Sequence, residues 1–296
     1  MKRRRLLSSA AFALSGCASL STDRKATGTT RTTNTTPKPN TVTNTTKETE
    51  TTISKSFSRT VGETISAESG LKLTISDCWI QHSLIWANFP DALTVTAHEG
   101  KQFVFVLVSG TGDVPPPRSA FTLSLDGTTY WPKSEFENEP LELVDSDHDE
   151  KPYQTQNERQ SSYGNGWLLF EIPDETAGEM AIGWEGEDAT AEWSLTDNQV
   201  SAFTAPRPKF EIVSFDVPGR AESIPFEMSV TVRNVGDGDG SFRGVLNQRG
   251  NMVLTWFTLS VPAGETRTWR YDYRHHAEKL ALVWEDGTID RDVEIG

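Results

Sequence analysis

From residue 57 onward, hydrophobic and polar residues alternate along the chain with the two-residue period of β-strands. Residues 103–108 differ, because they form a continuous run of Phe, Val and Leu, which predicts a central strand. Asp126 and Gly127 have the sequence of a tight hairpin turn. No segment shows the pattern of an amphipathic helix. The strands predicted in this part of the chain are 61–65, 71–75, 93–96, 103–108, 121–125, 167–173, 180–184 and 191–195.

A second group of strands follows the proline-containing segment 205–208, which we interpret as a stiff hinge. Seven short strands with turn residues between them are typical of a small β-sandwich. The sequence therefore predicts an all-β protein with two immunoglobulin-like β-sandwich domains, residues 57–203 and 204–296. The strands predicted for the second domain are 210–215, 226–232, 242–246, 253–261, 266–273, 280–284 and 289–295.

The N-terminus combines positive charge with a short apolar stretch. Basic residues 2–5 precede an apolar segment, 6–13, which falls short of the roughly 20 residues that span a bilayer. Arg3 and Arg4, followed by one free position and two apolar residues, resemble a twin-arginine export signal. The alternative is an ordinary apolar terminus. We favour a secretory signal peptide over residues 1–16.

The four residues after this stretch resemble the lipobox of lipoproteins: Leu14, Ser15, Gly16 and Cys17. The resemblance implies cleavage before Cys17 and attachment of a lipid to its thiol. We therefore expect a lipid-anchored protein on the outer face of the cytoplasmic membrane, with extracellular domains. The lipid on Cys17 would attach the protein to the membrane.

Residues 17–56 form the predicted linker, which is rich in Thr and nearly free of apolar side chains from residue 21. Such a composition cannot offset the entropy of ordering, so we expect an unstructured spacer. Asn34 and Asn44 each begin an Asn-Thr-Thr glycosylation sequon. The alternative is an unmodified polar linker.

Charge narrows the choice of partners. The chain has a formal net charge of −14, which becomes −18 without the four basic residues of the signal. Residues 57–296 hold 18 basic and 39 acidic side chains, a net charge of −21. Repulsion would replace the counterion release that drives binding to nucleic acid, so we exclude that partner class. We interpret the acidic surface as an adaptation to high salt, of the kind seen in lipoproteins of halophilic archaea.

The chain has two cysteines, and their positions leave the domains to be stabilised by hydrophobic cores and not by disulfides. If Cys17 carries the lipid, Cys78 has no partner for a disulfide. The alternating pattern of residues 73–80 predicts that Cys78 is a small buried side chain rather than a reactive thiol.

Two resemblances refine the predicted domains. The second domain is similar to the CARDB family of immunoglobulin-like modules in surface proteins of bacteria and archaea. The similarity lies in two segments that each combine a strand and a turn, residues 230–236 and 261–266. The first domain resembles telokin-like, immunoglobulin-fold domains of unknown function in secreted lipoproteins. That resemblance rests on residues 61–64, 100–106, 121–130 and 166–173, and it departs from the pattern at residues 109–112 and in a long insertion before Gly166. Neither resemblance implies catalytic residues.

Calcium is the one metal that the sequence suggests. Asp145, Asp147 and Asp149 alternate as oxygen ligands do in calcium loops. Glu150 and Gln156 occupy positions where an EF-hand requires Gly and Glu, so the alternative is a solvated acidic loop. Residues 237–240, Asp-Gly-Asp-Gly, are interpreted as a turn, with calcium as the alternative. Apart from this possible Ca²⁺, no cofactor is predicted.

Seven tryptophans lie in or beside predicted strands, where core packing explains most of them; the alternative is a sugar-binding aromatic face. They are Trp131, Trp167, Trp184, Trp193, Trp256, Trp269 and Trp284.

No histidine spacing of a zinc site, nucleophile elbow or phosphate-binding loop occurs. We therefore predict a cell-surface, lipid-anchored envelope protein that acts as a non-catalytic binding, adhesion or structural module, with envelope proteins or glycans as possible partners. The alternative is a solute- or Ca²⁺-binding lipoprotein, and an enzyme is not expected.

Overall fold

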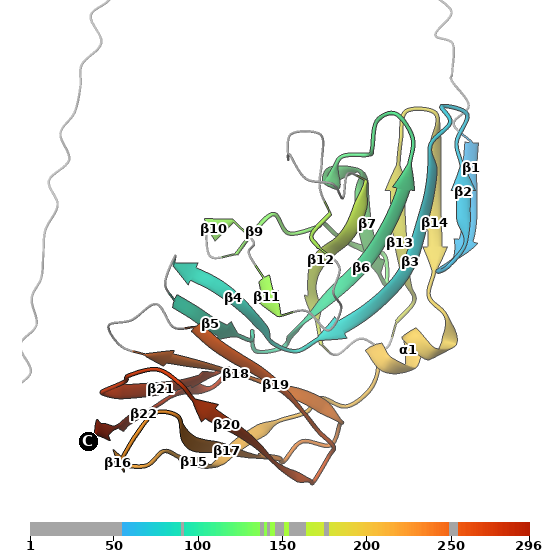
Figure 1. Ribbon diagram of the computed structural model, residues 1–296. Coiled ribbons are helices and arrows are strands. Elements are labelled where there is room, and N and C mark those ends of the chain that lie inside the picture. The colour runs from blue at the N-terminus through green and yellow to red at the C-terminus, as the bar shows by residue number, and fades with distance from the viewer. Residues whose placement is uncertain are drawn as a thin grey trace, which may run out of the picture. The chain divides into compact units, whose positions relative to one another are not determined.

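A computed structural model describes residues 55–89, 92–136, 139–140, 143–145, 151–153, 164–174, 178–248 and 254–296. These residues belong to one compact unit and form β-sheets with one α-helix and a single 3₁₀ turn (Figure 1). The predicted all-β fold class is therefore confirmed. None of the described helices is long and apolar enough to cross a membrane.

Two sheets enclose the first hydrophobic core. One has the order β1-β14-β13-β7-β8 and the other β12-β6-β3-β2. Their strands are β1 (Lys55–Thr60), β2 (Thr64–Ser66), β3 (Lys72–Gln81), β6 (Lys101–Thr111), β7 (Phe121–Leu125), β8 (Thr128–Tyr130), β12 (Asn165–Pro173), β13 (Met180–Glu185) and β14 (Ala189–Ser194). Strand β1 starts two residues before the domain start predicted from the sequence, and it pairs in parallel with β14.

Strand β6 lies between β12 and β3, which confirms the prediction of a central strand at 103–108. Val104, Val106 and Val108 face the first core. Phe103 and Phe105 point to the opposite face and join a separate buried cluster. The run lacks alternation because both of its faces are buried.

A three-stranded sheet, β11-β4-β5, covers that opposite face. Its strands are β4 (Leu84–Phe89), β5 (Ala92–Thr96) and β11 (Leu143–Asp145). Leu84 and Trp86 of β4 pack against Phe103 and Phe105, whereas Ile85 faces the other way. Strand β4 was absent from the predicted strands, because burial of both faces removes the polar–apolar alternation.

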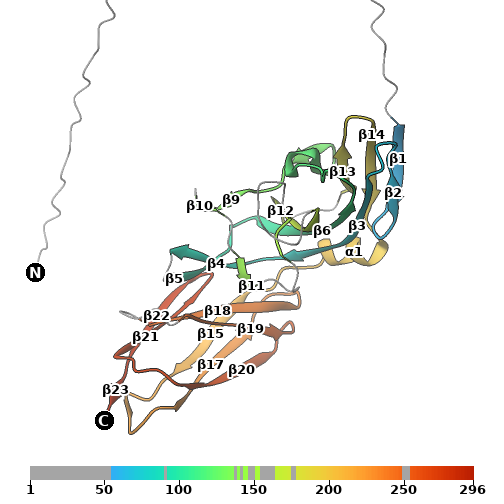
Figure 2. The same ribbon diagram turned by 45° about the horizontal axis from the view of Figure 1, so that its top comes forward.

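A second core lies between sheets β15-β17-β20 and β19-β18-β21-β22, with the small pair β16-β23 beside them (Figure 2). All seven strands predicted for this region are confirmed. They are β15 (Phe210–Asp216), β17 (Phe226–Asn234), β18 (Gly240–Gln248), β19 (Leu254–Val261), β20 (Thr266–Tyr273), β21 (Lys279–Trp284) and β22 (Gly287–Asp292), and the small pair is β16 (Arg220–Ala221) and β23 (Glu294–Ile295).

Strand β18 is also buried on both faces. Phe242 and Leu246 enter the second core, whereas Val245 packs with Ile85 of β4 in a cluster of its own. Asn247, on the same face as Val245, donates a hydrogen bond from Nδ2 to the Leu93 carbonyl oxygen of β5 at 3.1 Å. This apolar and polar contact joins β4 and β5 to the second pair of sheets.

The helix α1 (Asp197–Phe203) was not predicted, because the sequence shows no pattern of an amphipathic helix there. Thr196 and Gln199 form a reciprocal capping box at its start, and this Thr-x-x-Gln signal was readable in the sequence. Gln199 Nε2 also donates to Asp77 Oδ1 of β3 at 3.2 Å. The helix is therefore held by its cap and by β3, not by a long apolar face.

Two smaller predictions are also confirmed. Asp126 and Gly127 have φ angles of 48° and 76°, as a tight hairpin turn requires, and they join β7 to β8. Cys78 is free and buried at 3% exposure. Burial, with the nearby charge of Asp77, raises the pKa of its thiol above the usual range, so the group is an inert core side chain.

The remaining described strands are β9 (Glu135–Phe136) and β10 (Glu139–Pro140), which pair with each other, and the 3₁₀ turn η1 spans Arg118–Ala120. Both strands lie in the long insertion that precedes Gly166.

Candidate functional site

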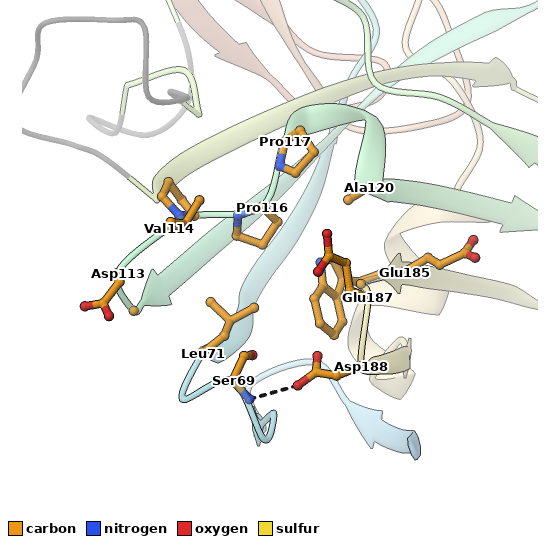
Figure 3. Close-up of a pocket in the computed structure, with 14 residues that line it drawn as sticks. Ser69, Leu71, Asp113, Val114, Pro116, Pro117, Ala120, Glu185, Glu187 and Asp188 are labelled. Atoms are coloured by element: carbon orange, nitrogen blue, oxygen red, sulfur yellow. Dashed lines mark hydrogen bonds between the residues drawn. The ribbon is translucent and has the colours of Figure 1, made fainter. Parts of the chain in front are cut away.

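A cleft of about 730 Å³ lies at one end of the first pair of sheets (Figure 3). Three connections form it: the turn between β2 and β3, the segment that follows β6, and the hairpin between β13 and β14. Loops at the end of a β-sandwich are the usual place for a binding site on such a scaffold. The cleft was not predicted from the sequence.

One wall of the cleft is the run Pro115-Pro116-Pro117. Each proline has a fixed φ angle and no backbone N–H, so the wall is stiff and lacks donors. Tyr153 holds it from behind, because the buried hydroxyl group donates to the Pro116 carbonyl oxygen at 2.8 Å. Arg118 Nε in turn donates to the Tyr153 carbonyl oxygen at 2.8 Å. The wall is therefore fixed in place before any ligand arrives.

Leu71, Ala120 and the indole of Trp184 add apolar surface. Trp184 is only 5% exposed, and its Nε1 is a buried donor with no hydrogen-bond partner among the described residues. A Cβ at Gly186 would lie 2.5 Å from Cζ2 of this indole, on the side of the ring that carries the N–H group. A side chain at this position would therefore collide with the indole, so glycine allows the close approach of the hairpin to the ring.

The rim of the cleft is acidic. Asp113, Glu185, Glu187 and Asp188 line it, and its fourteen lining residues include no Lys, Arg or His. Asp188 Oδ2 accepts a hydrogen bond from the Ser69 backbone N–H at 2.8 Å, which fixes that carboxylate (Figure 3). Carboxylates gathered around a low-dielectric apolar surface concentrate negative potential there.

A second cluster of charged groups lies where β4 approaches β18 and β21. Arg207 Nη1 pairs with Asp174 Oδ2 at 2.5 Å, and Ser83 forms a hydrogen bond with Glu285. Burial, together with the positive charges of Arg207 and Arg243, lowers the pKa of His82 to about 4 against the opposing charge of Asp174. Burial and the charge of Asp286 raise the pKa of Glu285. We interpret this cluster as a structural junction.

Most of the site residues expected from the sequence lie outside the described ranges. These are Arg3, Arg4, Leu14, Ser15, Gly16, Cys17, Asn34, Asn44, Asp147 and Asp149. Asp145 is the last residue of β11, where its backbone pairs with Ile85 of β4. In the described part of the chain, no group of three potential metal-ligating side chains comes together.

The segment 237–240 has the structure of a turn between β17 and β18. Asp239 Oδ1 accepts from the Ala263 backbone N–H at 2.8 Å, and the Gly238 carbonyl oxygen accepts from Asn234 Nδ2 at 2.8 Å. Both groups are therefore engaged within the fold, which favours the interpretation of this segment as a turn.

The tryptophans divide between core and surface. Trp167, Trp184 and Trp193 are buried, which confirms core packing for these three. Trp269 stacks on Phe257 with ring centroids 3.9 Å apart. Trp131 and Trp256 are 61% and 43% exposed, and the sugar-binding face stays a prediction.

No protein-family model and no curated protein sequence matches the chain. Among solved structures, a β-glucosidase from Listeria innocua in complex with isofagomine aligns over 31% of this chain and 17% of its own, at 14% identity and a TM-score of 0.21. A 1.5-MDa bacterial ice-binding adhesin aligns over 67% and 59%, at 14% identity and a TM-score of 0.22. The I9–I11 tandem of titin aligns over 81% and 96%, at 9% identity and a TM-score of 0.21.

The chain thus spans less than two thirds of the β-glucosidase and adhesin structures. Similarities of this size identify neither a function nor a ligand.

Proposed function

We propose that this protein is an exported, lipid-anchored binding module of the cell envelope, and that the cleft at the end of the first sandwich is its ligand-binding site. The observation that carries the proposal is the cleft itself, with a stiff proline wall, an apolar surface at Trp184 and an acidic rim. A pre-formed apolar concavity with a few convergent polar groups is the usual form of a ligand site.

The composition of the cleft supports binding rather than catalysis. Ser69 is the only hydroxyl side chain among its lining residues, and neither a histidine nor a lysine accompanies it there. Nucleophilic catalysis requires a base within hydrogen-bond reach of the nucleophile. The cleft instead offers shape and charge.

The proposed localisation of the protein rests on its N-terminal sequence. Arg3 and Arg4 would direct export, and the lipobox ending at Cys17 would supply the anchor. The acidic remainder of the chain suits a protein exposed to high salt. The proposed surface localisation and the cleft together support a non-catalytic binding or adhesion role at the cell surface.

A solute-binding lipoprotein is the second candidate. The cleft volume of about 730 Å³ lies within the range of roughly 300–1,000 Å³ that is usual for small-molecule sites. This candidate shares the anchor and differs only in the class of ligand.

The first experiment is mass spectrometry of the protein purified from its native membrane, beside a Cys17→Ser variant. The proposal expects a mature chain that begins at lipidated Cys17, and a variant that leaves the membrane or stays unprocessed. Retention of residues 1–16 in a protein found inside the cell would refute the anchored model.

A further inference from the structure

The acidic cleft has features that select among classes of ligand. We propose that it binds an extended, basic peptide segment of a partner protein, through Lys or Arg side chains at its rim and main-chain carbonyl groups over its apolar surface. This inference rests on the proposed binding function and adds the chemistry of the ligand.

The arrangement of charge favours an elongated cation. Figure 3 shows Asp113 on one side of the cleft and Glu187 and Asp188 on the other, with Leu71 and Pro116 between them. Among the described residues, these carboxylates do not converge into a group that would hold one metal ion. Positive charges that are spaced along a chain would satisfy both sides at once.

The apolar surface between the acidic residues favours a ligand that carries apolar groups as well as positive charge. Leu71, the proline wall and Trp184 would cover methylene groups of Lys or Arg stems, whose charged ends reach the rim. Aromatic-lined grooves of other proteins bind extended peptides. A bare inorganic cation would leave this surface exposed to water.

The indole of Trp184 bears on whether the ligand is a peptide or a free polyamine. Its buried Nε1 donor has no acceptor among the described residues, and an unsatisfied buried donor costs roughly 1–3 kcal/mol. Because Nε1 itself has almost no accessible surface, a main-chain carbonyl group of a ligand could accept this hydrogen bond only where the turn 185–188 shifts on binding. A fully protonated polyamine carries no acceptor. The unpaired N–H group therefore favours a ligand with carbonyl groups.

The net negative charge of the rest of the molecule would also attract a basic partner. Residues 57–296 have 18 basic and 39 acidic side chains, so long-range attraction would guide a basic segment toward the protein. The cleft adds local shape to that general attraction. A charge effect alone would not distinguish the cleft acids from acids elsewhere, and this difference makes the proposal testable.

The test is fluorescence anisotropy with the purified full-length chain and a labelled peptide of repeating Lys-Ala-Pro units. The cleft double variant Asp113→Asn/Glu187→Gln is compared with a matched double variant of exposed acids outside the cleft, Glu211→Gln/Glu222→Gln. We expect saturable binding that weakens about tenfold in the cleft variant and by less than about twofold in the matched variant. Circular dichroism checks that both variants fold.

Two further arms separate the ligand classes. Trp184→Phe keeps an aromatic ring but removes the N–H group, and we expect peptide binding to weaken about fivefold while spermidine binding is unchanged. A peptide with Glu in place of Lys is expected not to bind. Equal losses in the cleft and matched variants, absence of saturable peptide binding, or tighter binding of spermidine than of the peptide would each overturn the inference. None of these outcomes bears on the Cys17 anchor, which the mass spectrometry tests separately.

Discussion

The side chain of Asn234, at the end of β17, donates a hydrogen bond from Nδ2 to the Val261 carbonyl oxygen of β19 at 2.9 Å. The same Nδ2 donates to the Gly238 carbonyl oxygen, and Oδ1 accepts from the backbone N–H groups of Gly236 and Lys209. Asn234 is fully buried, and all four of its side-chain hydrogen bonds are made. It therefore connects the ends of β17 and β19 with the turn that leads to β18 and the entry to β15.

Replacement of this residue tests how much the four bonds contribute. Asn234→Ala would leave two buried carbonyl groups and two backbone N–H groups without partners, and we expect a loss of about 3 kcal/mol in the free energy of unfolding. Asn234→Asp keeps the acceptors but places a carboxylate against two carbonyl oxygens, so its loss should be at least as large. Denaturant unfolding measures both. The exposed Asn198→Ala should change stability by less than about 0.5 kcal/mol. A similar small change for Asn234→Ala would show that water replaces these bonds.

The contact between β4 and β18 can be tested through Ile85. This side chain is fully buried and packs with Leu93, Val95 and Val245. Ile85→Ala should lower the free energy of unfolding by about 3 kcal/mol, because it removes buried methyl groups and leaves a cavity. Val213→Ala, at a side chain that is 58% exposed, is the control and should cost less than about 0.5 kcal/mol. Equal effects of the two changes would mean that this contact contributes nothing to stability.

The junction around His82 should make stability depend on pH. The pKa of His82 is lowered from 6.5 to about 4 by burial and by Arg207 and Arg243, so the unfolded chain binds more protons than the folded chain between these values. The His82 contribution is therefore complete above pH 6.5 and is lost as the pH falls toward 4, by up to about 3 kcal/mol. Glu285 acts in the opposite direction, because its raised pKa favours the folded state on protonation.

Unfolding at a series of pH values, with His82→Gln beside the wild type, measures this effect. The variant should lose that part of the acid destabilisation which His82 causes, so the difference between the two curves should shrink from pH 6.5 to pH 4. His275→Gln, at an exposed histidine, is the matched control and should change the free energy of unfolding by less than about 0.5 kcal/mol. Parallel curves for His82→Gln and the wild type would contradict the assignment.

Thiol labelling tests Cys78 and the anchor together. Burial and the raised pKa of the Cys78 thiol should prevent its alkylation in the folded protein, because the thiolate is the reacting form. In denaturant, the lipidated chain should expose one reactive thiol, since Cys17 would be a thioether. Rapid labelling of the native protein would place Cys78 in an accessible environment, and two thiols in the denatured native-membrane protein would contradict lipidation.

Strands with one face in water were predicted from their alternation, because their polar positions reach solvent and mark the period. Two strands with both faces buried were also predicted: β6 from its long apolar run, and β18 from its position between turn residues. In β4, Leu84, Ile85 and Trp86 are all buried, so no polar residue marks the alternation. The helix α1 has seven residues, too few for a helical period, and only the Thr196–Gln199 capping box signalled it.

The cleft could not be predicted in the same way. Ser69 and Pro116 lie in two connections, and Trp184 lies near the end of β13, far from both in sequence. Only the pairing of β3 with β6, together with the packing of the two sheets around the first core, brings these segments to one end of the fold. The three consecutive prolines and the acids at 185–188 were visible in the sequence. Without the register of the sheets, nothing in the sequence joined them.

The parallel pairing of β1 with β14 has a mechanical consequence. Lys55 opens β1 opposite Ala189, and Thr60 ends it opposite Ser194, so the two strands run side by side in the same direction. A force that pulls on the chain before Lys55 and on the chain after Ser194 acts at opposite ends of this pair. The backbone hydrogen bonds between the two strands would then bear the load together, as in shear, instead of breaking one after another as in a zipper. At the point where the chain enters the fold, the protein is thus built to resist tension along its length.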